Sequence, residues 1–202
     1  FLPQIAQALR SSSNLILEAP PGTGKTTRVA PSLMDLDELP ARVALIQPRR
    51  IAARAAASRI AYERGCSIGS LVGYQVRFDS QCGHNTRLIS MTPGILLRRM
   101  QSDPLLEQFS AIVLDEFHER SQEMDLLLGL IRQIQVELRP ELRIVVMSAT
   151  LDDSQIVDYL GQPHVVKIDA ISYPVDIRYQ PFQAPQPRVS PTRRIIESVT
   201  SV

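Results

Sequence analysis

The chain has 202 residues, of which 44% are hydrophobic and 21% are charged, as is typical of a soluble globular protein. Its 22 Lys and Arg residues nearly balance 21 Asp and Glu residues, so bulk charge does not indicate a polyanion-binding protein and any such site must be a local patch. Cys66 and Cys82 provide neither a disulfide framework nor a metal-binding spacing, and no apolar run could span a bilayer. We therefore expect a cytoplasmic protein with no membrane partner.

Hydrophobic periodicity predicts alternating helices and strands along most of the chain. The expected helices cover residues 2–9, 26–33, 51–64, 92–99, 124–137 and 152–160. The expected strands cover residues 15–17, 43–46, 71–78, 87–91, 111–114 and 144–147. This alternation predicts an α/β fold in which a mostly parallel sheet carries helices on both faces.

The composition changes near Tyr173, where Pro and Gln residues begin to accumulate. Such a segment cannot sustain a helix and is typical of an extended linker. We expect a first domain at residues 1–171, a Pro-rich linker at residues 172–191 and the truncated start of a second domain at residues 192–202.

A Gly-rich segment joins the first expected strand to the helix that follows it. Its residues are Ala19, Pro20, Pro21, Gly22, Thr23, Gly24, Lys25, Thr26 and Thr27. Backbone N–H groups at such a helix start can surround the oxygens of a triphosphate, with Lys25 reaching the β- and γ-phosphates and the Thr26 hydroxyl on Mg²⁺. The pattern usually begins with Gly where this chain has Ala19, and the alternative is a Gly-rich turn that binds nothing. The strand–loop–helix context favours a nucleotide-binding loop.

An acidic segment, Asp115-Glu116-Phe117-His118, directly follows another expected strand. Ligands gather at the carboxyl ends of parallel strands, which is the edge where the Gly-rich loop lies. Asp115 could therefore hold Mg²⁺ through water, and Glu116 could orient and deprotonate an attacking water. An acidic cluster near a helix start is the alternative, and the upstream loop argues against it.

Three further groups of residues remain ambiguous from their spacing. Ser148, Ala149 and Thr150 follow a strand, where such residues are often helix caps. The adjacent pair Arg49 and Arg50 could clamp phosphates, although composition favours a solvated surface pair. The other ambiguous arginines are Arg77, Arg98 and Arg99, and His84 and His164 are expected to be surface residues in loops.

Taken together, these segments resemble the DEAH/RHA group of superfamily 2 helicases. Residues 19–27, 47–53, 92–94, 115–118 and 148–150 are similar to helicase motifs I, Ia, Ib, II and III, and residues 73–78 and 173–175 match connecting segments. The run 115–121 is similar to the bacterial HrpB-type branch, with Phe117 in place of the usual Ala. Pro93 also departs from the Asp or Glu common at its position.

The resemblance implies a RecA-like P-loop NTPase domain of an ATP-dependent, 3′-to-5′ RNA helicase with ATP and Mg²⁺ as cofactors. No adenine-reading Q motif is present, so other NTPs are also expected to serve. By analogy with the family, Arg59 would stack on the nucleotide base, and His118 with Ser148–Thr150 would couple nucleotide state to strand binding. The residues expected at a single-stranded nucleic acid, with RNA as the expected strand, are Arg49, Arg50, Arg77 and Thr92.

The family also implies a partner, the protein's own second RecA-like domain, which would supply arginine fingers. An arginine finger contributes ~10³–10⁵ in rate, so this chain alone is expected to bind nucleotide weakly and to hydrolyse it hardly at all. A second hypothesis is a switch or transporter ATPase, but residues 47–50 and 148–150 argue against it. A non-catalytic nucleic-acid-binding or scaffold module is a third, against which Lys25, Thr26, Asp115 and Glu116 argue.

Overall fold

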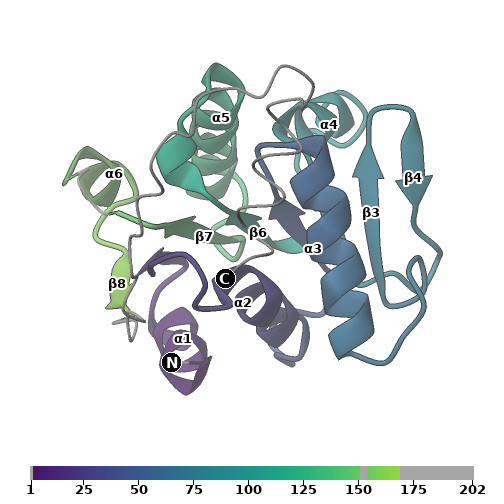
Figure 1. Ribbon diagram of the computed structural model, residues 1–202. Coiled ribbons are helices and arrows are strands. Elements are labelled where there is room, and N and C mark those ends of the chain that lie inside the picture. The colour runs from purple at the N-terminus through teal and green to yellow at the C-terminus, as the bar shows by residue number, and fades with distance from the viewer. Residues whose placement is uncertain (1, 151–153, 169–202) are drawn as a thin grey trace, which may run out of the picture. The chain divides into compact units, whose positions relative to one another are not determined.

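The computed structural model describes residues 2–150 and 154–168 (Figure 1). The helices are α1 (Leu2–Ser11), α2 (Lys25–Met34), α3 (Arg50–Glu63), α4 (Pro93–Arg99), α5 (Gln122–Glu137), α6 (Ser154–Tyr159) and the short 3₁₀ helix η1 (Phe117–Glu119). The strands are β1 (Asn14–Glu18), β2 (Arg42–Ile46), β3 (Val72–Val76), β4 (Asp79–Gln81), β5 (Leu88–Met91), β6 (Phe109–Leu114), β7 (Arg143–Ser148) and β8 (His164–Lys167). The predicted linker and second-domain start lie outside the described residues.

The strands form one eight-stranded sheet in the order β4-β3-β5-β2-β6-β7-β1-β8. Every neighbouring pair is parallel except β3 and β4, which are antiparallel. Parallel strands end at the same side of the sheet, and we call this side the carboxyl edge. The predicted α/β fold with a mostly parallel sheet is confirmed.

Alternating side chains of each strand pack into two separate cores, one on each face of the sheet. In β1, Leu15 and Leu17 belong to the core beneath α1, α2 and α3, whereas Ile16 belongs to the core beneath α4 and α5. Figure 1 shows the same division of the helices between the two faces. Burial on both faces explains why the strands are continuous apolar runs rather than alternating ones.

Two features of the sheet were not predicted. The expected strand at residues 71–78 ends at Val76, and the chain reverses at Arg77 and Phe78 into β4. The prediction that His164 lies in a loop was wrong, because His164 begins β8, which pairs with β1; its side chain is nevertheless exposed, as expected. β8 has only four residues and is mostly exposed, so it lacks the long apolar run that identifies a buried strand.

No helix in residues 2–150 and 154–168 has the length and apolar character needed to cross a bilayer.

Candidate nucleotide site and nucleic-acid interface

Strand order brings the candidate segments together at the carboxyl edge. β1, β7 and β6 are consecutive in the sheet, so the segments that follow them, residues 19–27, 148–150 and 115–118, are neighbours. The other half of the edge is formed by the ends of β2, β5 and β3. Those ends carry Arg49 with Arg50, Thr92, and Arg77. We name the two halves of the edge after their candidate roles, the nucleotide half and the strand-binding half.

The Gly-rich loop has the conformation that its two glycines allow. Gly22 and Gly24 have φ values of 82° and 75°, in the left-handed region that residues with a Cβ rarely adopt. Ala19, where the pattern usually has Gly, is fully buried, and its N–H donates to the Ser148 carbonyl oxygen at 2.9 Å. The loop thus tolerates Ala19, while its left-handed positions are both occupied by glycine.

Replacing Gly24 by alanine should destabilise the fold by about 1–2 kcal/mol through backbone strain and should also weaken nucleotide binding. The added Cβ would lie 3.6 Å from the Arg28 Nε atom, an ordinary contact, so strain is the main cost. Gly65→Ala is the matched control, because Gly65 has a φ of +61° with no atom near its added Cβ and lies outside the loop. Urea unfolding should show a similar loss for both variants. Equal nucleotide affinity in both variants would contradict the loop's assignment.

Lys25 is the first residue of α2, and its side chain is only 4% exposed. Its Nζ atom lies 3.2 Å from Glu116 Oε1 and donates to the Ala19 carbonyl oxygen at 3.4 Å. A buried ammonium group requires such partners, because desolvation of an unpaired charge is costly. The Lys25–Glu116 ion pair places the cation of the loop directly against the acidic segment.

Asp115 directly follows β6 and is a fully buried carboxylate. Its Oδ2 atom accepts hydrogen bonds from Thr26 Oγ1 at 2.5 Å and Gln47 Nε2 at 2.7 Å, and its Oδ1 atom accepts from the Glu116 N–H at 2.8 Å. Burial raises the pKa of Asp115, the hydrogen bonds from Thr26 and Gln47 oppose this rise, and the nearby Glu116 charge adds to it. A cation at this place would favour the charged form.

Thr26 and Asp115 fit Mg²⁺ because both supply oxygen atoms and their side chains are in contact. Mg²⁺ is usually held by one or two such groups together with phosphate oxygens and water. Within the described ranges, no three His, Cys, Asp or Glu side chains gather as a self-sufficient metal site. Gln47 was not predicted to reach the acidic segment. Its only sequence signal is a polar residue directly after a buried strand.

Glu116 has a φ of +50° and a ψ of 40°, a left-handed conformation that is uncommon for residues other than glycine. Such backbone strain is concentrated at functional sites. The conformation turns the chain from β6 into η1 and coincides with the Lys25 contact. Nothing in the residue types near Glu116 predicted it.

His118 is the last residue of the acidic segment and contacts residues 148–150. Its Nδ1 atom accepts a hydrogen bond from the Ala149 N–H at 3.2 Å and lies 3.5 Å from Glu116 Oε2. Because Nδ1 accepts from the amide, the ring proton of neutral His118 is on Nε2 and the Glu116 contact is not a hydrogen bond. His118 therefore joins the acidic segment to the end of β7.

Ser148 stabilises the turn that follows β7 instead of capping a helix with its side chain. Its hydroxyl donates to the Thr150 carbonyl oxygen at 2.5 Å and accepts from the Thr150 N–H at 3.3 Å. The next described helix, α6, begins at Ser154. The structure thus favours a shaped loop over the alternative of a helix cap at Ser148.

The arginines near the strand-binding half differ in how available their guanidinium groups are to a ligand. Arg49 is exposed and its Nη2 atom is 3.1 Å from Glu119 Oε2. Arg50, also exposed, donates from Nη2 to the Arg77 carbonyl oxygen at 2.9 Å. Arg99 is half-buried and donates from Nε to Gln75 Oε1 at 2.9 Å. Its guanidinium is therefore bonded to a side chain of β3 and is less available to a ligand.

Thr92 and Arg59 take different positions around this edge. Thr92 is the N-cap residue of α4 and its carbonyl oxygen accepts from the Ile95 N–H at 3.0 Å. Arg59 is exposed on α3, where it pairs with Glu63 at 2.7 Å and lies over the Tyr62 ring at 5.9 Å. Helix α3 packs beside α2, whose first turn is part of the loop.

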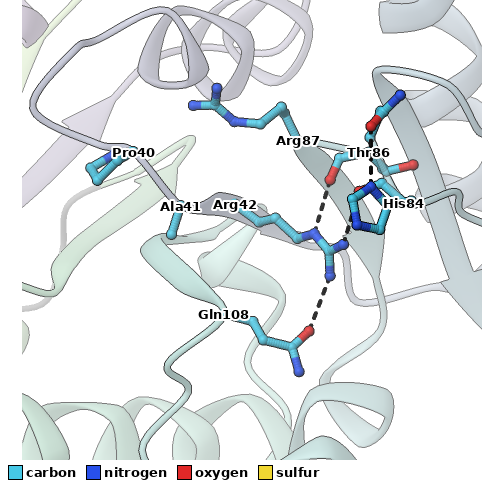
Figure 2. A pocket seen from close by; sticks show the side chains of 8 residues that line it. Pro40, Ala41, Arg42, His84, Thr86, Arg87 and Gln108 are labelled. Atoms are coloured by element: carbon cyan, nitrogen blue, oxygen red, sulfur yellow. Dashed lines mark hydrogen bonds between the residues drawn. The ribbon is translucent and has the colours of Figure 1, made fainter.

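The opposite edge of the sheet carries a hollow of about 560 Å³ (Figure 2). It is lined by Pro40, Ala41, Arg42, His84, Asn85, Thr86, Arg87 and Gln108. The Arg42 guanidinium donates to the Thr86 and His84 carbonyl oxygens and to Gln108, as Figure 2 shows. The Arg42 guanidinium is therefore already hydrogen-bonded within the protein, and the carboxyl edge is the better candidate for a ligand site. His84 is exposed in a turn, as predicted.

Comparison with known proteins decides the family. The DEAD/DEAH box helicase family matches residues 3–158, which is most of the chain. The chain belongs to the DEAD/DEAH box helicase family. The family predicted from residues 19–27, 115–118 and 148–150 is confirmed.

Relatives of this helicase domain include ATP-dependent RNA helicase HrpB of Escherichia coli strain K12, which is 40% identical over 92% of this chain and 23% of the relative. Probable ATP-dependent RNA helicase DHX34 of Homo sapiens is 34% identical over 97% of this chain and 18% of the relative. The crystal structure of the Escherichia coli DEAH/RHA helicase HrpB superposes with a TM-score of 0.83 at 39% identity, over 91% of this chain and 23% of the solved chain. The chain thus spans about a quarter of the length of these relatives or less, and the predicted RecA-like domain is confirmed.

Proposed function

We propose that this chain is the first RecA-like domain of an ATP-dependent RNA helicase and couples nucleotide hydrolysis to movement along a single strand. The observation that carries this proposal is the contact of Lys25 with Glu116 together with that of Thr26 with Asp115. These four side chains are the ones that phosphate binding, Mg²⁺ binding and water activation require. Their convergence comes from two segments that are far apart in the sequence.

In the nucleotide half, the backbone N–H groups of residues 22–27 would bind phosphate oxygens, with Lys25 moving from Glu116 toward the β- and γ-phosphates. Glu116, released from its ion pair, would then orient and deprotonate the attacking water. Mg²⁺, held by Thr26 and Asp115, would neutralise phosphate charge. Arg59 would stack on the base, with ATP as the expected nucleotide and other NTPs also accepted.

Communication between nucleotide and strand would pass through the segment 148–150. The hydrogen bond from the Ala19 N–H to the Ser148 carbonyl oxygen joins this segment to the phosphate loop. The hydrogen bond from the Ala149 N–H to His118 Nδ1 joins it to the acidic segment. A displacement of the phosphate loop or of the acidic segment would therefore also move the residues at the end of β7. This supports the coupling role proposed for residues 148–150 and His118.

On the strand-binding half, Arg49, Arg50, Arg77 and Thr92 would contact the phosphates of a single-stranded nucleic acid. The names of the relatives favour RNA. Phosphate contacts alone do not distinguish RNA from DNA, whereas contacts to the 2′-hydroxyl do.

The domain division proposed here is residues 1–171 for this RecA-like domain, residues 172–191 for a linker and residues 192–202 for the start of a second RecA-like domain. That second domain would be the chain's partner at the nucleotide site. We also propose a cytoplasmic location.

The proposed function predicts that the intact protein unwinds an RNA duplex carrying a 3′ single-stranded tail, with ATP and Mg²⁺ required. A gel-shift unwinding assay would compare the wild type with Lys25→Ala. Unwinding that persisted in Lys25→Ala, or that needed no nucleotide, would contradict the proposal. A 5′-tailed duplex serves as the control for direction.

The ion pair of Arg49 with Glu119 should compete with RNA phosphate for the Arg49 guanidinium. Exposed ion pairs contribute about 0.2–1 kcal/mol, so Glu119→Gln should tighten binding of single-stranded RNA by up to about fivefold. Fluorescence anisotropy with a labelled oligonucleotide would measure this. Glu63→Gln, which breaks the similar Arg59 pair on α3, is the control and should leave RNA affinity unchanged. Weaker binding by Glu119→Gln would contradict the competition.

A further inference from the structure

The turn between β3 and β4 presents an aromatic ring to solvent. Phe78 is 89% exposed and has a φ of +67°. A two-residue hairpin turn favours Asn, Asp or Gly where φ is positive, and a bulky residue there is a genuine outlier. Exposing the ring also forgoes the free energy of burying it. The fold therefore gains almost no burial from Phe at this position, which points to a ligand for the ring.

The ring is held in place by the strand-binding half of the edge. Arg50 donates to the backbone carbonyl oxygen of Arg77, and the Arg77 guanidinium lies 4.8 Å from the centroid of the Phe78 ring. On the β4 side, Asp79 accepts from the Tyr74 hydroxyl at 3.0 Å and pairs with Arg54 at 3.4 Å. The turn is therefore tied to both α3 and β3, and its acidic group is matched by an arginine.

Resting on the function proposed above, we infer that Phe78 is a stacking platform for a nucleobase of the single strand bound by Arg49 and Arg50. Every nucleobase presents a flat π-face, and stacking on aromatic side chains is a general way to bind single strands without sequence preference. The arginines next to the ring suit an anionic backbone better than the apolar surface of a protein partner. Arg77 adds a cation–π contact to the ring, and its guanidinium supplies positive charge beside it.

The test compares two labelled RNAs of equal length, oligouridylate and an abasic strand with the same sugar–phosphate backbone. Anisotropy titrations would use the intact protein and its Phe78→Leu, Phe78→Tyr and Tyr62→Leu variants. Tyr62 is 78% exposed and lies at the far end of α3, so it controls for loss of an exposed aromatic ring.

We expect Phe78→Leu to weaken oligouridylate binding by about 5- to 150-fold and to leave abasic-strand binding and the salt dependence unchanged. Phe78→Tyr should keep the wild-type affinity for oligouridylate, and Tyr62→Leu should behave as the wild type. An equal loss on both strands, or no loss, would overturn the inference. Unchanged RNA affinity would leave the exposed ring to a protein partner instead. If the wild type bound neither strand, the proposed function itself would fail; binding that depends on Arg49 and Arg50 but not on Phe78 would remove only the stacking platform.

Discussion

Replacing Glu116 by glutamine should lower RNA-stimulated ATP hydrolysis by ~10²–10⁴-fold in the intact protein while leaving ATP binding intact. Glutamine has nearly the shape of glutamate but cannot accept the proton of the attacking water. The variant also removes the charge that holds Lys25 at 3.2 Å, so Lys25 becomes free for phosphate and nucleotide affinity should not fall. Steady-state hydrolysis and calorimetric titration with Mg·ATP would measure the two effects.

Glu119→Gln is the matched control for Glu116→Gln, because Glu119 lies three residues further on, at the end of η1, and pairs with Arg49. It should retain hydrolysis at saturating RNA. If Glu116→Gln hydrolysed ATP at the wild-type rate, Glu116 would not be the general base and another group would have to activate the water.

The double variant Arg49→Ala, Arg50→Ala should weaken binding of single-stranded RNA by roughly 30-fold or more at low salt. Each charge-assisted hydrogen bond to phosphate contributes about 1.5–3 kcal/mol, and part of this is offset because Arg49 also loses its Glu119 pair. Loss of two phosphate contacts should also reduce the slope of log affinity against log salt by about 1.4. Anisotropy titrations at several salt concentrations would give both quantities.

Two controls separate charge from shape at the arginine pair. Arg49→Lys with Arg50→Lys should keep the salt slope and lose only part of the affinity, because lysine retains charge without the bidentate fork. Arg98→Ala removes an exposed arginine at the end of α4 and should have little effect. A double alanine variant with wild-type affinity would mean that the strand lies elsewhere.

The sequence predicted the sheet and the meeting of residues 19–27 with residues 115–118, because the determinants of both are local. Buried parallel strands are continuous apolar runs, and the loop at residues 19–27 has its own glycines, lysine and threonine. Once the strands are known to be parallel, Asp115 and Lys25 must lie at the same edge. This geometric rule needs no knowledge of strand order.

The remaining features depend on distant contacts that no local pattern records. The hairpin turn at Arg77 and Phe78 contains no glycine or asparagine and is held by Arg50, which lies 27 residues away. Gln47 reaches Asp115 across 68 residues, so its role depends on β2 and β6 being neighbours. Strain at Glu116 likewise arises from its position between β6 and η1.

Calorimetric titration of the intact protein with Mg·ADP, beside its Lys25→Ala variant, tests the central claim most directly. The account predicts one nucleotide per chain for the wild type and loss of binding in Lys25→Ala, because the buried Lys25 ammonium would be the cation that binds the phosphates. Binding of Mg·ADP by Lys25→Ala with unchanged affinity would contradict it and would place the nucleotide away from residues 19–27.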